Sequence, residues 1–89
     1  MPLYNAQVFI QLKDGILDPQ GKAVEHALAS LKFTGMSDVR IGKMIELQVE
    51  SPNETQAAGN VEQACEKLLA NPIIETYEFK LSQLNEAGA

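Results

Sequence analysis

Few residues of this 89-residue chain have the types and the spacing that catalysis or metal binding needs. The sole histidine, His26, has no second ligand at metal-binding spacing, and the sole cysteine, Cys65, has no second thiol for a disulfide or a CxxC site. The pair Gly21-Lys22 stands without the glycine-rich loop that holds phosphate in nucleotide-binding proteins. The sequence therefore predicts no catalytic site, no metal site and no bound cofactor in this chain.

The polar residues that remain as candidates for contacts with another protein gather in two segments, KDGILDPQGK at 13–22 and DVRIGK at 38–43. Glycine inside a helix costs about 1 kcal/mol relative to alanine, so Gly21 indicates that something approaches the backbone closely there, and alanine is expected to leave folding unharmed or improved. Lys43 and Glu75 each interrupt an apolar strand face, so we expect them to pair. The predicted partner-contact surface consists of Asp14, Gln20, Gly21, Lys22, Arg40 and Lys43.

The length and the charge of the chain limit what it can bind. Eighty-nine residues form one small domain with little room for an enclosed active site, so the size of the chain suits work with a partner. The net charge of −5 argues against nucleic acid and against an anionic membrane surface as partners. No apolar run approaches the ~20 residues of a membrane span, and the N-terminus has no leader pattern. These features predict a cytoplasmic protein.

Turn and cap signals predict the elements that position the first polar segment. Apolar and polar residues alternate over 4–12, and the alternation stops at the turn pair Asp14-Gly15, so a strand ends there. Asp18 is a good N-cap residue and Pro19 suits the first helical position, which predicts a helix over 19–33. This helix is amphipathic, with one apolar stripe made of Ala23, Val24, Ala27, Leu28 and Leu31.

The second half of the chain is predicted to contain a helix followed by a strand. Apolar spacing predicts a second helix over 53–70, which Asn53 can cap and Asn71-Pro72 stops. A strand over 73–81 follows. The domain is therefore predicted over 1–81, and residues 82–89 are expected to fray.

The segment between the two helices allows two interpretations. A hairpin that turns at Gly42-Lys43 would bury three polar residues, Glu46, Gln48 and Glu50. One continuous strand over 39–49 instead places apolar residues on one face, which only Lys43 interrupts. Eleven residues at ~3.3 Å each reach about 36 Å, whereas a domain of this size has a radius of gyration of about 12 Å. We therefore predict one long strand whose overhang is covered by a second copy of the chain, with a seam at Ile45, Leu47 and Val49.

These elements together predict an α+β fold. It is a two-layer β-α-β-α-β domain whose largely antiparallel sheet is extended across subunits of a homodimer or a larger homo-oligomer.

Three motifs resemble the PurS family, the small subunits of the multi-subunit phosphoribosylformylglycinamidine synthase of purine biosynthesis. They read LKDGILDPQGKAVEHAL at 12–28, DVRIGKMIEL at 38–47 and KLLANPIIETY at 67–77. The similarity covers nearly the whole chain. One departure is the loop between Phe33 and Asp38, where the family pattern has an apolar residue and Met36 is the candidate for it. Nothing after Leu81 matches the pattern.

The resemblance implies a non-catalytic subunit that joins an ATP-dependent synthetase subunit to a glutaminase subunit and helps to form or shield the path of ammonia between them. The assembled enzyme would convert formylglycinamide ribonucleotide, glutamine and ATP to formylglycinamidine ribonucleotide, glutamate, ADP and phosphate. ATP and magnesium would be used by the complex and not by this chain. The alternative is an ACT-like regulatory module that binds a small metabolite at a dimer interface. Gly15 in the loop after the first strand fits that alternative, but the single long middle strand speaks against it.

Overall fold

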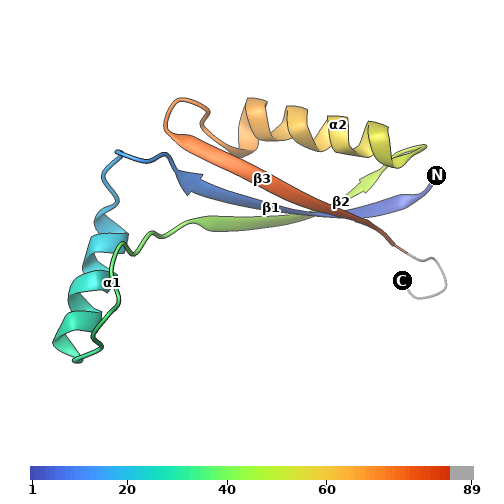
Figure 1. Cartoon of the computed structure of the whole chain (residues 1–89). Helices are drawn as coiled ribbons and strands as arrows, with labels where there is room; N and C mark the ends of the chain where they lie inside the picture. The colour runs from blue at the N-terminus through green and yellow to red at the C-terminus, as the bar shows by residue number, and fades with distance from the viewer. Residues whose placement is uncertain (85–89) are drawn as a thin grey trace.

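The computed structural model describes residues 1–84, which form one three-stranded sheet and two α-helices (Figure 1). The elements are β1 (Leu3–Leu12), α1 (Pro19–Ser30), β2 (Lys43–Glu50), α2 (Glu54–Ala64), which continues as a π-helical turn η1 (Cys65–Leu69), and β3 (Glu75–Gln83). Both outer strands run antiparallel to β1, in the order β2-β1-β3. The predicted α+β class and the β-α-β-α-β order are confirmed. None of the described helices combines the length and the apolar character that crossing a membrane requires.

The central strand β1 supplies half of the hydrophobic core. Every second residue points to the face that α2 covers, so Tyr4, Ala6, Val8 and Ile10 are each at most 4 % exposed. The register places Val8 between Ile45 of β2 and Phe79 of β3. The other layer contributes the remaining buried apolar residues, namely Ala57, Val61, Cys65 and Ala70. The alternation in the first twelve residues is therefore the pattern of a half-covered sheet.

The second helix begins and ends where the sequence predicts, but its last turn is wider. The Asn53 side chain caps it by accepting the Gln56 N–H at 2.8 Å. In the π turn the Ala70 N–H reaches back to the Cys65 carbonyl at 2.9 Å, and both residues are buried. Because this turn spans five residues, Cys65 and Ala70 both face the sheet. A turn over 71–74 then delays β3 to Glu75, so Ile73 is exposed rather than part of the strand.

The strand predicted over 39–49 is a single pass without a hairpin, but only its second part pairs. The β1–β2 register ends where Lys43 lies opposite Ile10, and residues 38–42 belong to no strand. The prediction is therefore wrong for 39–42. The physical reason is that the backbone N–H groups of Val39 and Ile41 bond to side-chain carboxylates instead of a neighbouring strand.

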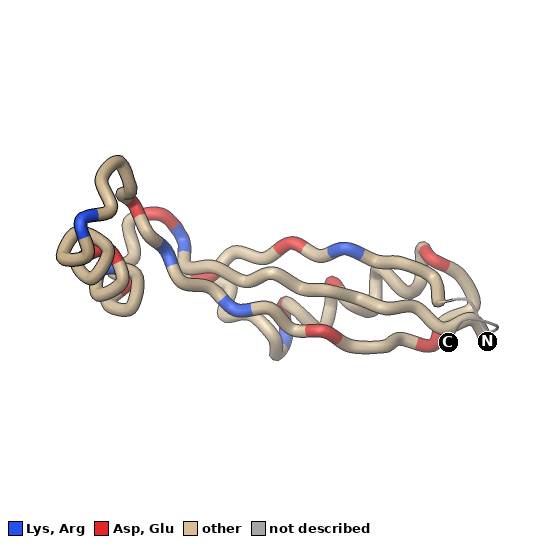
Figure 2. The backbone as a smooth tube through the Cα atoms, turned by 90° about the horizontal axis from the view of Figure 1, so that it is seen from below, with Lys and Arg blue, Asp and Glu red and all other residues tan. Residues whose placement is uncertain are grey.

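The first helix projects beyond one end of the sheet and does not cover it (Figures 1 and 2). The described fold is elongated as a result, with extents of 51 × 32 × 15 Å. The helix ends at Ser30 rather than near 33, and Lys32 and Gly35 follow with positive φ. Only Gly21 is buried in α1, so the predicted apolar stripe stays uncovered within the chain. We call residues 19–37 the arm; its exposed large apolar residues are Val24, Leu31, Phe33 and Met36.

At the other end of the chain, β3 runs two residues past the strand end predicted at 81. The Leu84 N–H then bonds to the Leu3 carbonyl at 2.7 Å. The expected fraying therefore does not apply to 82–84, and residues 85–89 lie outside the described part of the chain.

Candidate functional site

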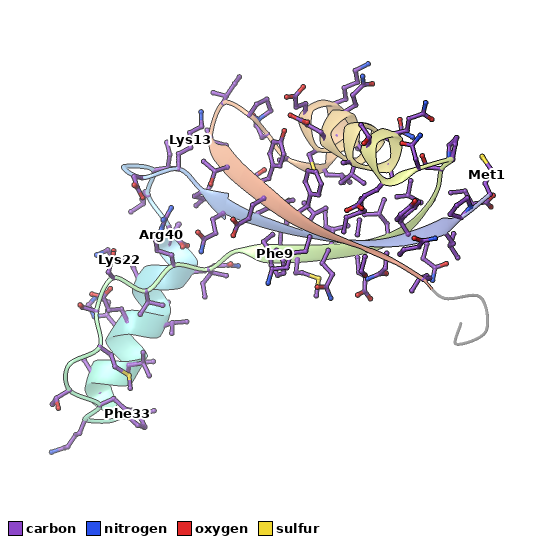
Figure 3. All side chains as sticks on the ribbon, turned by 45° about the vertical axis from the view of Figure 1, so that its right-hand side comes forward. Met1, Phe9, Lys13, Lys22, Phe33 and Arg40 are labelled. Carbon is purple, nitrogen blue, oxygen red and sulfur yellow. The ribbon has the colours of Figure 1, made fainter. Side chains whose placement is uncertain are left out.

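The predicted partner-contact residues meet where the arm joins the sheet. We call this place the hinge and define it as residues 13–22 and 38–43. Figure 3 shows Lys22 and Arg40 near the base of α1, and Lys13 at the adjoining end of the sheet. All of the predicted contact residues lie within the hinge, and all except Gly21 are at least partly exposed. The structure therefore brings two distant motifs together at one exposed corner.

Asp18 ties the two hinge segments to each other. One carboxylate oxygen, Oδ1, accepts the Gly21 N–H at 2.9 Å, which is the predicted N-cap. The other, Oδ2, accepts the Ile41 N–H at 2.7 Å. The hydrogen bonds from Gly21 and then Ile41 hold the pKa of the Asp18 carboxyl below its ordinary value, against the opposite effect of burial, and the charge of Arg40 adds to them. The residue is therefore both a helix cap and a link to the returning segment.

Gly21 is buried inside the hinge and does not belong to an exposed contact surface. A Cβ at this position would lie 2.8 Å from Asp18 Oδ2 and closer still to the Val39 carbonyl oxygen, nearer than real Cβ atoms approach other atoms. The close approach that the sequence indicated therefore comes from the chain's own returning segment. The expectation that alanine here leaves folding unharmed is wrong for the same reason.

Arg40 also has a role within the chain. Its guanidinium donates a hydrogen bond to the carbonyl of Leu12, the last residue of β1, and pairs with Asp14 at 3.1 Å. The Asp14 side chain is 98 % exposed, so this ion pair contributes at most about 1 kcal/mol to stability. Beside it, the Val39 N–H bonds to Glu25 of α1 at 3.3 Å. Each of residues 39–41 thus makes a hydrogen bond to the hinge, to α1 or to the end of β1.

The expected pair of Lys43 and Glu75 is confirmed. Their charged atoms lie 3.8 Å apart at the hinge end of the sheet. The two residues come from the outer strands β2 and β3, so the pair bridges across the end of β1. The Lys43 side chain remains 56 % exposed, which leaves its ammonium group available to another protein.

The predicted seam residues Ile45, Leu47 and Val49 face the same side of the sheet as α2 and are half-buried. They pack against the core cluster, but β2 is an edge strand, with β1 on one side and no strand on the other in the described part of the chain. The seam and the arm are therefore two incompletely covered apolar surfaces of one chain.

The described residues contain no group of three side chains able to hold a metal ion. The sheet face opposite α2 carries an open hollow of about 650 Å³, whose lining includes Phe9, Met44, Thr76 and Glu78. These side chains include no nucleophile with a neighbouring base. Cys65 is buried, and burial raises the pKa of its thiol, which makes it a packing residue.

Comparison with known proteins gives a consistent result. Residues 5–83 match the family profile of PurS, described as phosphoribosylformylglycinamidine (FGAM) synthase. The chain is 43 % identical over 82 residues to the phosphoribosylformylglycinamidine synthase subunit PurS of Bacillus subtilis, which covers 92 % of this chain and 96 % of that protein. It is 42 % identical over 82 residues to the subunit of the same name from Methanocaldococcus jannaschii, with 92 % and 99 % covered.

Solved structures share the fold. The crystal structure of Methanocaldococcus jannaschii PurS, one of the subunits of formylglycinamide ribonucleotide amidotransferase in the purine biosynthetic pathway, superimposes with a TM-score of 0.81 at 40 % identity, covering 92 % of this chain and 99 % of that one. A chain in the structure of PurLQS from Thermotoga maritima gives a TM-score of 0.85 at 36 % identity, covering 92 % and 100 %.

The contact between Gly21 and Val39 predicts opposite effects of one substitution at two helical glycines. Gly21→Ala should lower the free energy of unfolding by about 1–3 kcal/mol, because the new methyl group forces the hinge segments apart. Gly59→Ala in α2, where a methyl group would meet nothing within 4 Å, should raise it by about 0.5–1 kcal/mol through helix propensity. Urea unfolding measures both. Equal effects of the two substitutions would contradict the packing described for Gly21.

The lowered pKa of Asp18 predicts acid sensitivity of the hinge. A carboxylate whose pKa is lower in the folded state stabilises the fold above its ordinary pKa, near 3.8, and loses that contribution as the pH falls through the folded value. The difference in stability between the wild type and Asp18→Asn should therefore be largest at neutral pH and shrink below about pH 4. Urea unfolding across pH 3–7 measures this difference, and a gap that stays constant would refute the assignment.

Proposed function

The chain belongs to the PurS family of phosphoribosylformylglycinamidine synthase subunits, and from that membership we propose that it is the non-catalytic structural subunit that joins the ATP-dependent synthetase subunit to the glutaminase subunit of this enzyme. The observation that carries the proposal is the similarity to a chain of the Thermotoga maritima PurLQS structure, which this chain matches over that chain's entire length. Surfaces suited to protein contact, described above for the hinge and the seam, support the same role.

In this proposal the partner subunits carry the chemistry. ATP and magnesium are used by the synthetase subunit, glutamine is hydrolysed by the glutaminase subunit, and this chain holds the two so that ammonia passes between them without loss. When the two active sites are held close together, the synthetase reaction does not depend on the concentration of free ammonia in solution. The setting is the cytoplasm, and a single buried cysteine agrees with a reducing compartment.

The exposed part of the hinge is the proposed docking surface for one of these partners. It comprises Asp14, Gln20, Lys22, Arg40 and Lys43. Arg40 and Lys43 have internal partners, so they are held in place before a partner arrives, whereas Lys22 lies on the first turn of α1 with an exposed side chain. An acidic group on the partner would meet three cations here. The ACT-like alternative loses support, because β2 is a single strand and the βαββαβ order is absent from the described residues.

The seam and the arm support a second part of the proposal, that the chain forms a homodimer or a larger homo-oligomer. The arm exposes a row of apolar side chains, and the seam of β2 is only half-buried. Two copies related by a two-fold axis can cover each other's seam with each other's arm. The arm carries two basic residues and one acidic residue, whereas the chain as a whole has a net charge of −5. The arm can therefore approach an acidic body without charge repulsion.

Docking through the hinge predicts that the interaction depends on charge at Lys22. Lys22→Glu should weaken co-elution with the partner subunits about tenfold, equivalent to 1.4 kcal/mol, and should reduce glutamine-dependent synthesis. Lys67→Glu makes the same charge change on η1, away from the hinge, and is the control. Reconstitution with both partner subunits is the measurement. Unchanged assembly and turnover with Lys22→Glu would remove the hinge from consideration while leaving the bridging role open.

Self-association through the seam predicts that a charge there separates the copies. Leu47→Asp should lower both the fraction of oligomer and the stability, because an unpaired carboxylate enters an apolar surface. Gln48→Asp, on the opposite face of the same strand, should leave both unchanged. Light scattering gives the mass and circular dichroism reports the fold. A folded wild-type chain with a mass near its monomer value of 9.7 kDa would contradict this part of the proposal.

A further inference from the structure

The arm has two ways to cover its apolar face, and the sequence does not choose between them. It can fold back over the seam of its own sheet, or it can lie over the seam of a second copy. The first way needs no association, so it costs no loss of translational freedom. A chain that nevertheless keeps its arm extended must contain interactions that prevent the arm from folding back over its own sheet.

The hinge contains such a device. Asp18 accepts hydrogen bonds from both hinge segments, from Gly21 at 2.9 Å and from Ile41 at 2.7 Å. The Val39 N–H is held by Glu25 from the second turn of α1, and the Val39 carbonyl packs against the backbone of Gly21. The first two turns of α1 are thus fixed along the segment that returns to the sheet.

The returning segment is itself fixed to the sheet. Arg40 donates a hydrogen bond to the Leu12 carbonyl at the end of β1. Gly42 lies so close to the Ile10 carbonyl that a side chain at 42 would collide with it, and β2 begins at the next residue. The segment 38–42 between the arm and β2 is therefore held at several points. The arm can rotate over its own sheet only if these contacts break.

We propose that Asp18 locks the hinge and holds the arm away from its own sheet, so that the apolar face of the arm is available only to a second copy of the chain. Asp18 is a positioning residue in this device, since its contacts lie within its own chain. The inference deepens the homo-oligomer part of the proposed function and rests on it for the identity of the occupant. A lock of this kind explains why one carboxylate both caps α1 and accepts a hydrogen bond from a residue 23 positions later.

The substitution Asp18→Asn tests the lock without removing the helix cap. Asparagine caps a helix as well as aspartate does, but one of its two terminal groups is an NH₂, which cannot accept the Ile41 N–H. Asp38→Asn is the matched control, because it removes the same charge from the same hinge and its side chain makes no hydrogen bond in the described structure. Three readouts apply to the full chain: amide hydrogen exchange at Ile41, the radius of gyration by small-angle scattering, and the dimer dissociation constant by sedimentation.

The lock predicts three effects of Asp18→Asn. The Ile41 amide hydrogen should exchange at least about tenfold faster, and the dimer dissociation constant should rise about tenfold. The released monomers should have a smaller radius of gyration than a chain with an extended arm. Asp38→Asn should resemble the wild type in all three. An Asp18→Asn protein with wild-type shape, association and exchange would overturn the proposal, as would a compact wild-type monomer. If the wild type is an extended monomer that becomes compact on Asp18→Asn, the lock stands and self-association fails. Enzyme assembly with the partner subunits is a separate measurement, so a failure of the bridging role is recognised independently.

Discussion

One helix is too narrow to cover the apolar face of a three-stranded sheet, and the rest of the molecule is arranged around this shortage. Strands lie about 4.8 Å apart and a helix with its side chains is about 10–12 Å wide, so α2 covers little more than two strands. The central strand β1 is fully buried on this face, whereas the residues of the outer strands that face α2 stay half-buried. A sheet of this kind needs a second helix. The chain has one, but places it beyond the end of the sheet.

The hinge explains how α1 comes to lie there. Polar side chains occupy the backbone donors of residues 39 and 41, which would otherwise extend β2. A buried glycine lets α1 lie against this segment at a distance that any side chain would prevent. The interactions that shorten the strand are therefore the same ones that direct the helix outward. A change that restored strand pairing at 39–42 would also have to release α1.

The parts of the fold that the sequence predicted are those that depend on neighbouring residues. The alternation over 4–12, the caps at Asp18 and Asn53, and the stop at Asn71-Pro72 are local signals, and the structure contains all of them. The pair of Lys43 and Glu75 is predictable because each residue interrupts an apolar face. The errors share one cause, which is contact between distant residues. The shortened β2, the uncovered α1 and the burial of Gly21 all follow from bonds across 14 to 23 positions, and periodicity carries no information on such bonds.

The motifs that resemble the family also have a role within the chain, beside the contact with a partner that is proposed for their exposed residues. Asp18, Gly21, Arg40 and Gly42 lie in two of the motifs that resemble the family, and in the structure each of them contacts its own chain. A motif shared with the family can therefore serve the geometry of the hinge as well as contact with a partner. If the chain joins two larger subunits as a homo-oligomer, as proposed above, this geometry has functional weight. The direction of the arm would then decide where a second copy sits and where both docking surfaces point. In that proposal, residues whose observed contacts lie within their own chain help to determine how the partners are placed.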